Sequence, residues 1–249
     1  MNQSMDILVS EYRDFENSVT LVFKKRVFEG CIDDFTDEEV IGMLVQRRHI
    51  SCLFTSLCDT IGPLLPEQKS RAIVEGIVRD EYAEMNHREA YVMELEGLGI
   101  PRETLKTIPY TTETLRCGRM LVEYALDCAR REEIYALASL RVFAEFLAGE
   151  EFLFFFRKLF VNNARRKPED SVFLRPHIDW DLRGAEEGSD GHADQYLRPI
   201  NSMLRTAEDL ELAREAVIAA AAMRAAFYKQ YCSKLRMGRA DIEKAARHV

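Results

Sequence analysis

A chain of 249 residues, 47% of them hydrophobic, can enclose a sizeable core, and we expect a single domain covering residues 1–249. The formal net charge of −8 argues against the basic surface of a nucleic-acid binder, so we expect no nucleic-acid partner. The sequence shows no apolar run long enough to cross a membrane, no secretory signal and no CxxC spacing among its six cysteines, which predicts a cytoplasmic protein with reduced thiols and no membrane partner.

Helical patterns account for nearly the whole sequence. In chain order, the predicted helices cover residues 5–28, 36–61, 66–96, 109–130, 132–160, a segment from 168 that Pro176 kinks or delays, and two closing segments that include 210–235. Thr36 and Glu39 form a capping box at one helix start, and Gly62 with Pro63 ends that helix. No alternation typical of strands interrupts the series. The sequence therefore predicts an all-α bundle of about seven or eight helices.

Side chains that could bind metal occur first in the predicted helix 66–96. Asp80, Glu84 and His87 are spaced by four and three residues, and this spacing places them on one face of a helix. Buried carboxylates need a compensating charge, which a metal ion supplies. The competing interpretation is a solvated charged stripe that includes Glu81 and Glu84.

Glu145 lies in the most apolar of the predicted helices, 132–160. Its apolar neighbours leave the carboxylate few routes to water, which favours a role inside the bundle. The competing interpretation is a glutamate at the helix edge, paired with Arg141. Glu150 and Glu151 are further candidates for this central carboxylate, but the spacing and the apolar flanks favour Glu145.

His177 and Asp181 follow in the segment after residue 168. They are four residues apart, so on a helix they point the same way and form a pair that can bind one metal ion. Such a pair on its own could also cap or brace a helix. Three helices that each offer carboxylates or imidazoles nevertheless predict a buried two-metal site. Oxygen and nitrogen ligands suit iron or manganese, and the cysteine spacing argues against structural zinc.

One ExxH motif, Glu84 to His87, combined with an HxxxD motif, His177 to Asp181, resembles the haem-oxygenase-like di-iron oxidases. The resemblance implies the haem-oxygenase helical fold with two Fe(II) ions in place of haem. In that pattern His87 with Glu84 or Asp80 matches the first ligand element, and Glu145 matches the central one. The family's further ligand after HxxxD would fall on Gly184, so His192 and, more remotely, His49 are weaker metal candidates.

The resemblance also implies an oxidase or oxygenase that activates O2 and acts on a small molecule, with an amino acid or amino-acid derivative as the expected substrate. The expected reactions are N-oxygenation, fragmentation, decarboxylation or nitrile formation, and a biosynthetic role would follow. A substrate carboxylate would need a cation, and the candidates are Arg47, Arg141 and Arg175, with Arg48 beside them. For any one of these arginines a surface ion pair is the competing role.

Three other interpretations come from different classes of protein. The first is a metal-free enzyme or small-ligand binder of the thiaminase-like type on the same fold. The second is a haem binder with His49 as axial ligand. The third is a non-catalytic helical interaction protein whose site residues are surface charges. A homodimer is compatible with each of these interpretations.

Overall fold

The computed structural model describes residues 3–83, 86–183 and 191–247, and within these ranges the chain is helical with no strand. The α-helices are α1 (Gln3–Phe23), α2 (Asp37–Cys52), α3 (Phe54–Ile61), α4 (Gln68–Ala83), α5 (His87–Gly97), α6 (Arg102–Thr107), α7 (Thr112–Cys128), α8 (Glu133–Leu140), α9 (Leu147–Phe156), α10 (Leu174–Ile178), α11 (His192–Met203), α12 (Ala207–Tyr228) and α13 (Arg239–Ala246). The all-α prediction is confirmed.

Shorter helical segments join several of these helices. The π-helical ones are η1 (Lys24–Ile32), η3 (Arg141–Phe146), η4 (Arg157–Val161) and η6 (Asp179–Arg183), and the 3₁₀ turns are η2 (Gly62–Leu64) and η5 (Pro168–Asp170). π-Helical turns are rare, and they are frequently found at functional sites. Two of these segments, η3 and η6, carry residues singled out in the sequence.

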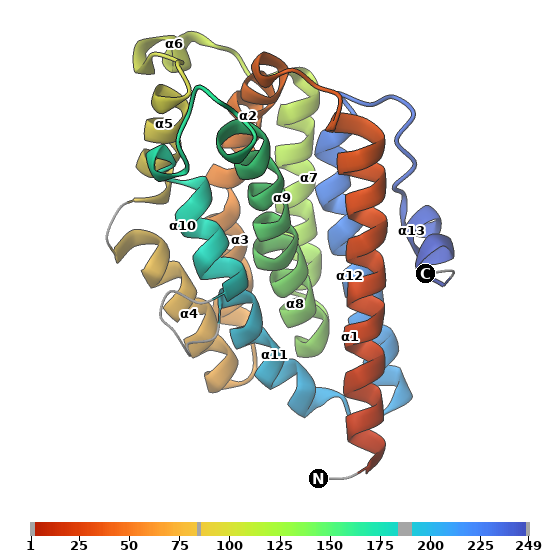
Figure 1. Ribbon diagram of the computed structural model, residues 1–249. Coiled ribbons are helices and arrows are strands. Elements are labelled where there is room, and N and C mark those ends of the chain that lie inside the picture. The colour runs from red at the N-terminus through yellow and green to blue at the C-terminus, as the bar shows by residue number, and fades with distance from the viewer. Residues whose placement is uncertain (1–2, 84–85, 184–190, 248–249) are drawn as a thin grey trace.

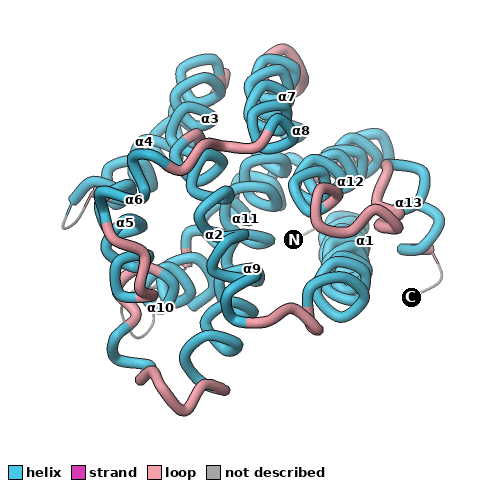
Figure 2. Tube along the Cα trace, turned by 90° about the horizontal axis from the view of Figure 1, so that it is seen from above, coloured by secondary structure: helices cyan, strands magenta, loops and turns pink. Residues whose placement is uncertain are grey.

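A continuous rod of α8, η3 and α9 forms the centre of the bundle. In Figure 1 this rod is flanked by α1 and α12 on one side and by α10 and α4 on the other. Every residue from Ile134 to Glu145 is buried, so this stretch has apolar contacts all round and must lie inside. α12 can approach α8 closely because Ala213, Ala216 and Ala220 are fully buried on it. The view along the bundle in Figure 2 shows α9 beside α2, with α10 on one side and α1 on the other.

The predicted helix boundaries hold in some places and fail in others. The capping box before α2 is present, since Glu39 N donates to Thr36 Oγ1 and Thr36 N donates to Glu39 Oε2. The predicted helix 132–160 is the central rod. The predicted helix 66–96 is wrong, because α4 ends at Ala83 and α5 begins at His87. That break decides which residues reach the site.

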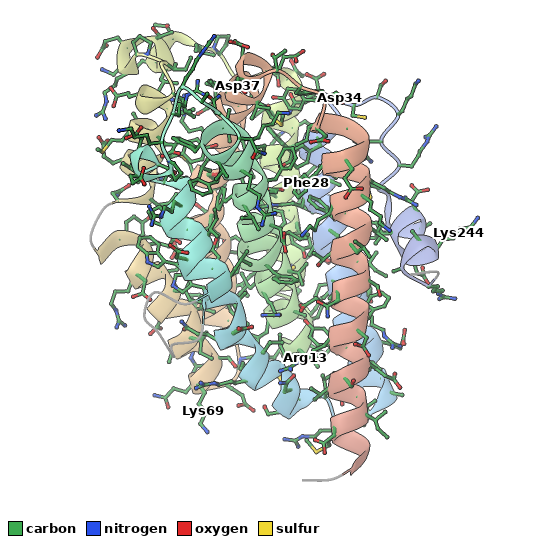
Figure 3. All side chains as sticks on the ribbon, viewed as in Figure 1. Arg13, Phe28, Asp34, Asp37, Lys69 and Lys244 are labelled. Carbon is green, nitrogen blue, oxygen red and sulfur yellow. The ribbon has the colours of Figure 1, made fainter. Side chains whose placement is uncertain are left out.

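Charged side chains lie on the outside of the bundle, as expected for a chain with a large hydrophobic core. Charged side chains such as Lys69 and Lys244 project outward from the bundle in Figure 3. All six cysteines are free thiols. Among the helices described, none combines the length and the hydropathy needed to cross a membrane.

Candidate metal centre

The break between α4 and α5 brings Glu81, and not Asp80, to the site. α5 has its own N-cap, in which Asn86 Oδ1 accepts a hydrogen bond from Arg88 N, so the chain starts a new helix there. The face that Asp80 was expected to share with His87 therefore does not exist. The Asp80 side chain is 59% exposed, and its Oδ2 lies 3.5 Å from His192 Nε2. Glu84, the other expected partner of His87, lies outside the described residues.

Glu81, His87 and His177 form a first group of metal-ligand type, called group 1 below. Their ligand atoms all lie within 4.8 Å of one another, and all three residues are buried. His177 Nε2 is 3.1 Å from His87 Nδ1 and 3.7 Å from Glu81 Oε2, and His87 Nδ1 also contacts Glu81 Oε2. Two imidazoles and one carboxylate are a donor set that suits Fe(II).

The orientation of His177 is fixed by its outer ring nitrogen. His177 Nδ1 donates to Phe173 O at 2.8 Å, so in the neutral imidazole Nε2 carries the lone pair that faces group 1. Phe173 also packs on the imidazole, with ring centroids 4.0 Å apart. The rings of Phe152 and Trp180 contact the same imidazole, with centroid distances of 5.6 and 5.2 Å. An imidazole held in this way is prepared for a metal, because its tautomer and its direction are already set.

Glu94 links α5, which carries His87, to the start of α10, which carries His177. The Glu94 side chain is buried on α5, where its Oε1 accepts from Ser171 Oγ at 2.8 Å and its Oε2 accepts from Val172 N and Phe173 N at 2.7 and 2.9 Å. These amides precede α10 and have no partner within that helix. Burial raises the pKa of Glu94, and the hydrogen bonds from Ser171 and the amides oppose this rise. The carboxylate thus positions the start of α10 and, four residues later, His177.

Glu94→Gln is therefore expected to destabilise the protein by about 1–3 kcal/mol, since a Gln oxygen that accepts from the two amides leaves its NH2 group facing the Ser171 hydroxyl, which loses its acceptor, and the charge of the acceptor is lost as well. Urea unfolding of the metal-free protein measures this change. Glu96→Gln on the same helix is the control, because Glu96 is exposed and bonds only Arg102 there. Equal stability of both variants would contradict the positioning role.

Glu145, Asp181 and His192 form a second group, called group 2. Their ligand atoms also lie within 4.8 Å of one another, and all three residues are buried. His192 Nδ1 is 3.6 Å from Glu145 Oε2 and 3.7 Å from Asp181 Oδ1. Within the described part of the chain, Glu145 Oε1, Asp181 Oδ1 and His192 Nδ1 have no hydrogen-bond partner. Three unsatisfied buried ligand atoms that converge on one point fit a cation, which would compensate the cost of burying them.

The elements that carry group 2 explain how it assembles. Glu145 lies in π-helical η3, Asp181 in π-helical η6, and His192 is the first residue of α11. Arg141 braces this arrangement, because its Nε and Nη2 donate to the two carboxylate oxygens of Glu16 at 2.8 Å and its Nη1 donates to Ala193 O. The guanidinium thus joins α1, η3 and the start of α11, immediately beside His192.

His177 and Asp181 do not share a metal position. The sequence led us to expect that this pair would bind one ion, but His177 belongs to group 1 and Asp181 to group 2. On a regular α-helix, residues four apart share one face and could bind one ion. Here the chain passes from α10 into the π-helical η6 between them, and the wider turn gives Asp181 a different direction from His177. The HxxxD motif therefore spans the two groups.

Burial and close contacts set the protonation of the metal-free centre. Burial raises the pKa of Glu145 to about 7, against the lowering effect of His192. Burial lowers the pKa of His192, but Asp181 and Glu145 outweigh it and raise this pKa to about 11. Burial would raise the pKa of Glu81, yet His177 and His87 hold it well below its usual range. In group 2 a proton on His192 thus takes the place that a cation would fill.

Both groups lie on one small buried cavity of about 20 Å³. Its walls include Glu81, His87 and His177 of group 1, Glu145 and Asp181 of group 2, and two arginines, Arg47 and Arg224. A volume of this size holds about one water-sized group. Residues of the two groups therefore border the same small space.

The other predicted site residues lie elsewhere, apart from Arg47. Arg141 is bonded to Glu16, and Arg175 is exposed. His49 is half-buried against α7, where Gly118 leaves no room for a Cβ beside the imidazole. That close approach of α7 speaks against His49 as an axial haem ligand.

Sequence reasoning missed Glu81 and Arg224. Glu81 follows the buried Val74 and Ile77 at intervals of seven and four, so its place on the inner face of α4 could have been recognised. Arg224 lies in the Ala-rich α12, where nothing in the local sequence marks it as a residue of the cavity.

Comparisons with known proteins agree with this geometry. A family model described as iron-containing redox enzyme matches residues 42–229, a range that includes all six residues of groups 1 and 2. Among solved structures, a TenA homologue from Pseudomonas syringae pv. tomato is similar over 92% of each chain, with a TM-score of 0.62 and 14% sequence identity. At this identity the similarity concerns the fold. No curated protein matches the chain significantly.

Proposed function

The chain belongs to the iron-containing redox enzyme family and has a haem-oxygenase-like fold, and from this premise we propose that it is a non-haem di-iron oxidase or oxygenase that uses O2 to oxidise a small molecule. The observation that carries the proposal is the presence of two buried three-ligand groups on one cavity. A single mononuclear site would need only one of them.

The donor atoms support two ferrous ions as the cofactors. Group 1 offers two imidazoles and one carboxylate, and group 2 offers one imidazole and two carboxylates. Imidazole nitrogen and carboxylate oxygen suit iron, and three protein ligands leave positions open for O2 or a substrate. Iron bound there would supply the electrons for the reduction of dioxygen.

The residues around the groups prepare them for this chemistry. Phe173 O holds the tautomer of His177, and Glu94 holds the segment from which that carbonyl projects. Phe152 and Phe173 shield the His177 imidazole from water. A dry, preorganised pocket strengthens the electrostatic interactions at the reacting centre.

An amino acid or amino-acid derivative is the proposed substrate class, with N-oxygenation, fragmentation, decarboxylation or nitrile formation as the candidate reactions. Two buried arginines on the cavity wall, Arg47 and Arg224, share the single carboxylate of Glu151, and this local excess of positive charge supports a substrate that carries a carboxylate.

Oxygen consumption tests the proposed function. Protein loaded anaerobically with Fe(II) is mixed with O2 and a panel of free amino acids, and we expect at least one of them to accelerate O2 uptake over the loaded protein alone. Metal-free protein and iron-loaded His177→Ala are the controls, and both should remain at background. Equal O2 uptake by the wild type and His177→Ala would refute the proposal.

A metal-free enzyme or ligand binder of the thiaminase-like type is the second candidate, favoured only by the structural similarity to the TenA homologue. Such an enzyme would use a nucleophilic cysteine or several histidine and arginine contacts. Cys58 is the thiol most affected by Glu145 and Glu81, and burial raises its pKa well above the usual value. A reactive thiolate at that position is therefore disfavoured.

A further inference from the structure

The outer face of α7 carries an unusual number of apolar side chains. Its inner face packs on α2, α3 and α12, and Figure 2 shows the helix at the edge of the bundle. Of the ten large apolar side chains that are exposed in the described part of the chain, four lie on this one helix, namely Leu115, Met120, Val122 and Leu126. Single exposed apolar residues are ordinary, but several on one element indicate a contact surface.

Three of these residues form a line along the helix, called the α7 stripe below. Val122 and Leu126 follow Leu115 by seven and eleven residues, and these offsets keep the three side chains within about 20° of one line. Their exposed fractions are 48%, 44% and 44%, respectively. Arg119 lies between Leu115 and Val122, at the remaining position of this line. Intervals of four, three and four residues are the spacing with which two helices pack along a common seam.

Charged side chains border the α7 stripe. Arg116 and Glu123 lie seven residues apart on one flank of it, and both are exposed. Within the described residues, Arg116, Arg119 and Glu123 make no salt bridge. By contrast, Arg102, also at the surface, pairs with two glutamates of its own chain. The flank of α7 therefore presents a positive and a negative charge, two helical turns apart, that remain available to a partner.

An antiparallel second copy of α7 matches both the stripe and its charges. When Leu115 lies opposite Leu126 of the second copy, the two-fold axis crosses the middle of the helix, and the same contact occurs twice. Arg116 is then displaced from Glu123 of the second copy by two residues, about 3 Å along the helix, which a long arginine side chain can span. A parallel arrangement would place Arg116 opposite Arg116 and Glu123 opposite Glu123, and like charges at these positions repel.

We propose that the α7 stripe is the interface of a symmetric homodimer, in which the α7 helices of two copies pack antiparallel. A second copy is the occupant because the flank of this face is complementary in charge to itself after a rotation of 180°. One helix from each copy makes an interface at the small end of the specific range, so the dimer is reversible and dissociates on dilution. The inference goes beyond the proposed function, since the α7 stripe lies on the outside of the bundle and groups 1 and 2 lie inside.

Sedimentation velocity of the full chain tests the dimer, at protein concentrations from about 1 to about 300 μM, in metal-free and in anaerobic Fe(II)-loaded protein. We expect a monomer that converts reversibly to a dimer as the concentration rises, in both preparations. Leu126→Lys places a charge in both of the contacts with Leu115 and should weaken dimerisation at least tenfold. Leu21→Lys is the matched control, because Leu21 is 37% exposed on α1, which packs on α12 and α13. That variant should dimerise like the wild type.

Charge reversal tests the antiparallel arrangement. Arg116→Glu should dimerise at least tenfold more weakly than the wild type, because two carboxylates then meet at each of the two symmetric contacts. Glu123→Arg should do the same with two guanidinium groups. A single exposed ion pair contributes little, but here an attraction is replaced by a repulsion at two places. In a mixture of the two variants opposite charges meet again, so a heterodimer should form at least tenfold more tightly than the homodimer of either variant.

Three results would overturn the inference: a wild type that stays monomeric over the whole range, Leu126→Lys that dimerises like the wild type, or a mixture no more dimeric than its components. The substituted side chains are exposed, and circular dichroism verifies that each variant is folded. If one charge variant fails to fold, the wild type and Leu126→Lys decide. Absence of iron binding would remove the di-iron proposal and leave the dimer intact, whereas a monomeric protein that binds iron and consumes O2 would have the opposite meaning.

Discussion

Glu81→Ala is expected to reduce the iron content of the loaded protein from about two ions per chain, the number held by bundle carboxylate sites of this kind, to about one. Glu81 supplies the only carboxylate of group 1, and its removal leaves His87 and His177 as the remaining ligands of that group. Loss of an outer hydrogen-bond partner already costs about 10- to 100-fold in metal affinity, so loss of a direct ligand should cost more. Iron analysis after anaerobic loading and desalting measures the effect.

Asp80→Ala is the matched comparison, one residue earlier on the same helix. Among the described residues its exposed side chain meets the centre only at the outer nitrogen of His192, a group 2 residue, so any loss of affinity should fall on group 2 and the ion of group 1 should remain bound. The opposite pattern, in which Asp80→Ala loses the ion of group 1 and Glu81→Ala retains both, would show that the unbroken helix expected from the sequence is correct.

Glu145→Gln has the second large expected effect. Glu145 is the carboxylate of the central rod, and its Oε1 has no partner among the residues described. Glutamine keeps the shape but lacks the charge that binds a cation, so the ion of group 2 should be lost and substrate-dependent O2 uptake should fall at least about 100-fold, the typical scale for loss of one preorganised electrostatic contact. Group 1 should keep its ion, so the protein retains about one iron per chain.

Glu150→Gln is the control for that variant. Glu150 is only partly buried on α9 and pairs with Lys24, on the side of the rod away from the metal groups. Iron content and O2 uptake should stay at wild-type values. Retention of two ions and full O2 uptake by Glu145→Gln would contradict a metal at group 2.

Much of the fold could be predicted because its signals are local. Thr36 with Glu39 marks a helix start through two side chains three residues apart, and the apolar run 132–160 must lie inside whichever helices surround it. The inward carboxylate of Glu145 follows from the same run. His87, His177 and Asp181, which the sequence singled out, lie in the two buried groups.

The parts of the site that the sequence did not predict depend on breaks between helices and on contacts between residues far apart in the sequence. No proline or glycine marks the end of α4, and Asn86, an N-cap residue, is the one local sign of the break that brings in Glu81. His192, which the sequence offered only as a weaker metal candidate, is the first residue of α11 and lies in group 2. The pair of Glu151 and Arg224 joins residues 73 positions apart, which no periodicity reveals.

Anomalous diffraction at the iron absorption edge, from crystals loaded anaerobically with Fe(II), tests the central claim most directly. Two peaks are expected, one among Glu81, His87 and His177 and one among Glu145, Asp181 and His192. Ligand distances near 2 Å would identify these side chains as direct ligands, since first-row metals bind imidazole nitrogen and carboxylate oxygen at about this distance. A loaded crystal with no iron peak at either group, or with iron bound only elsewhere, would contradict the di-iron centre.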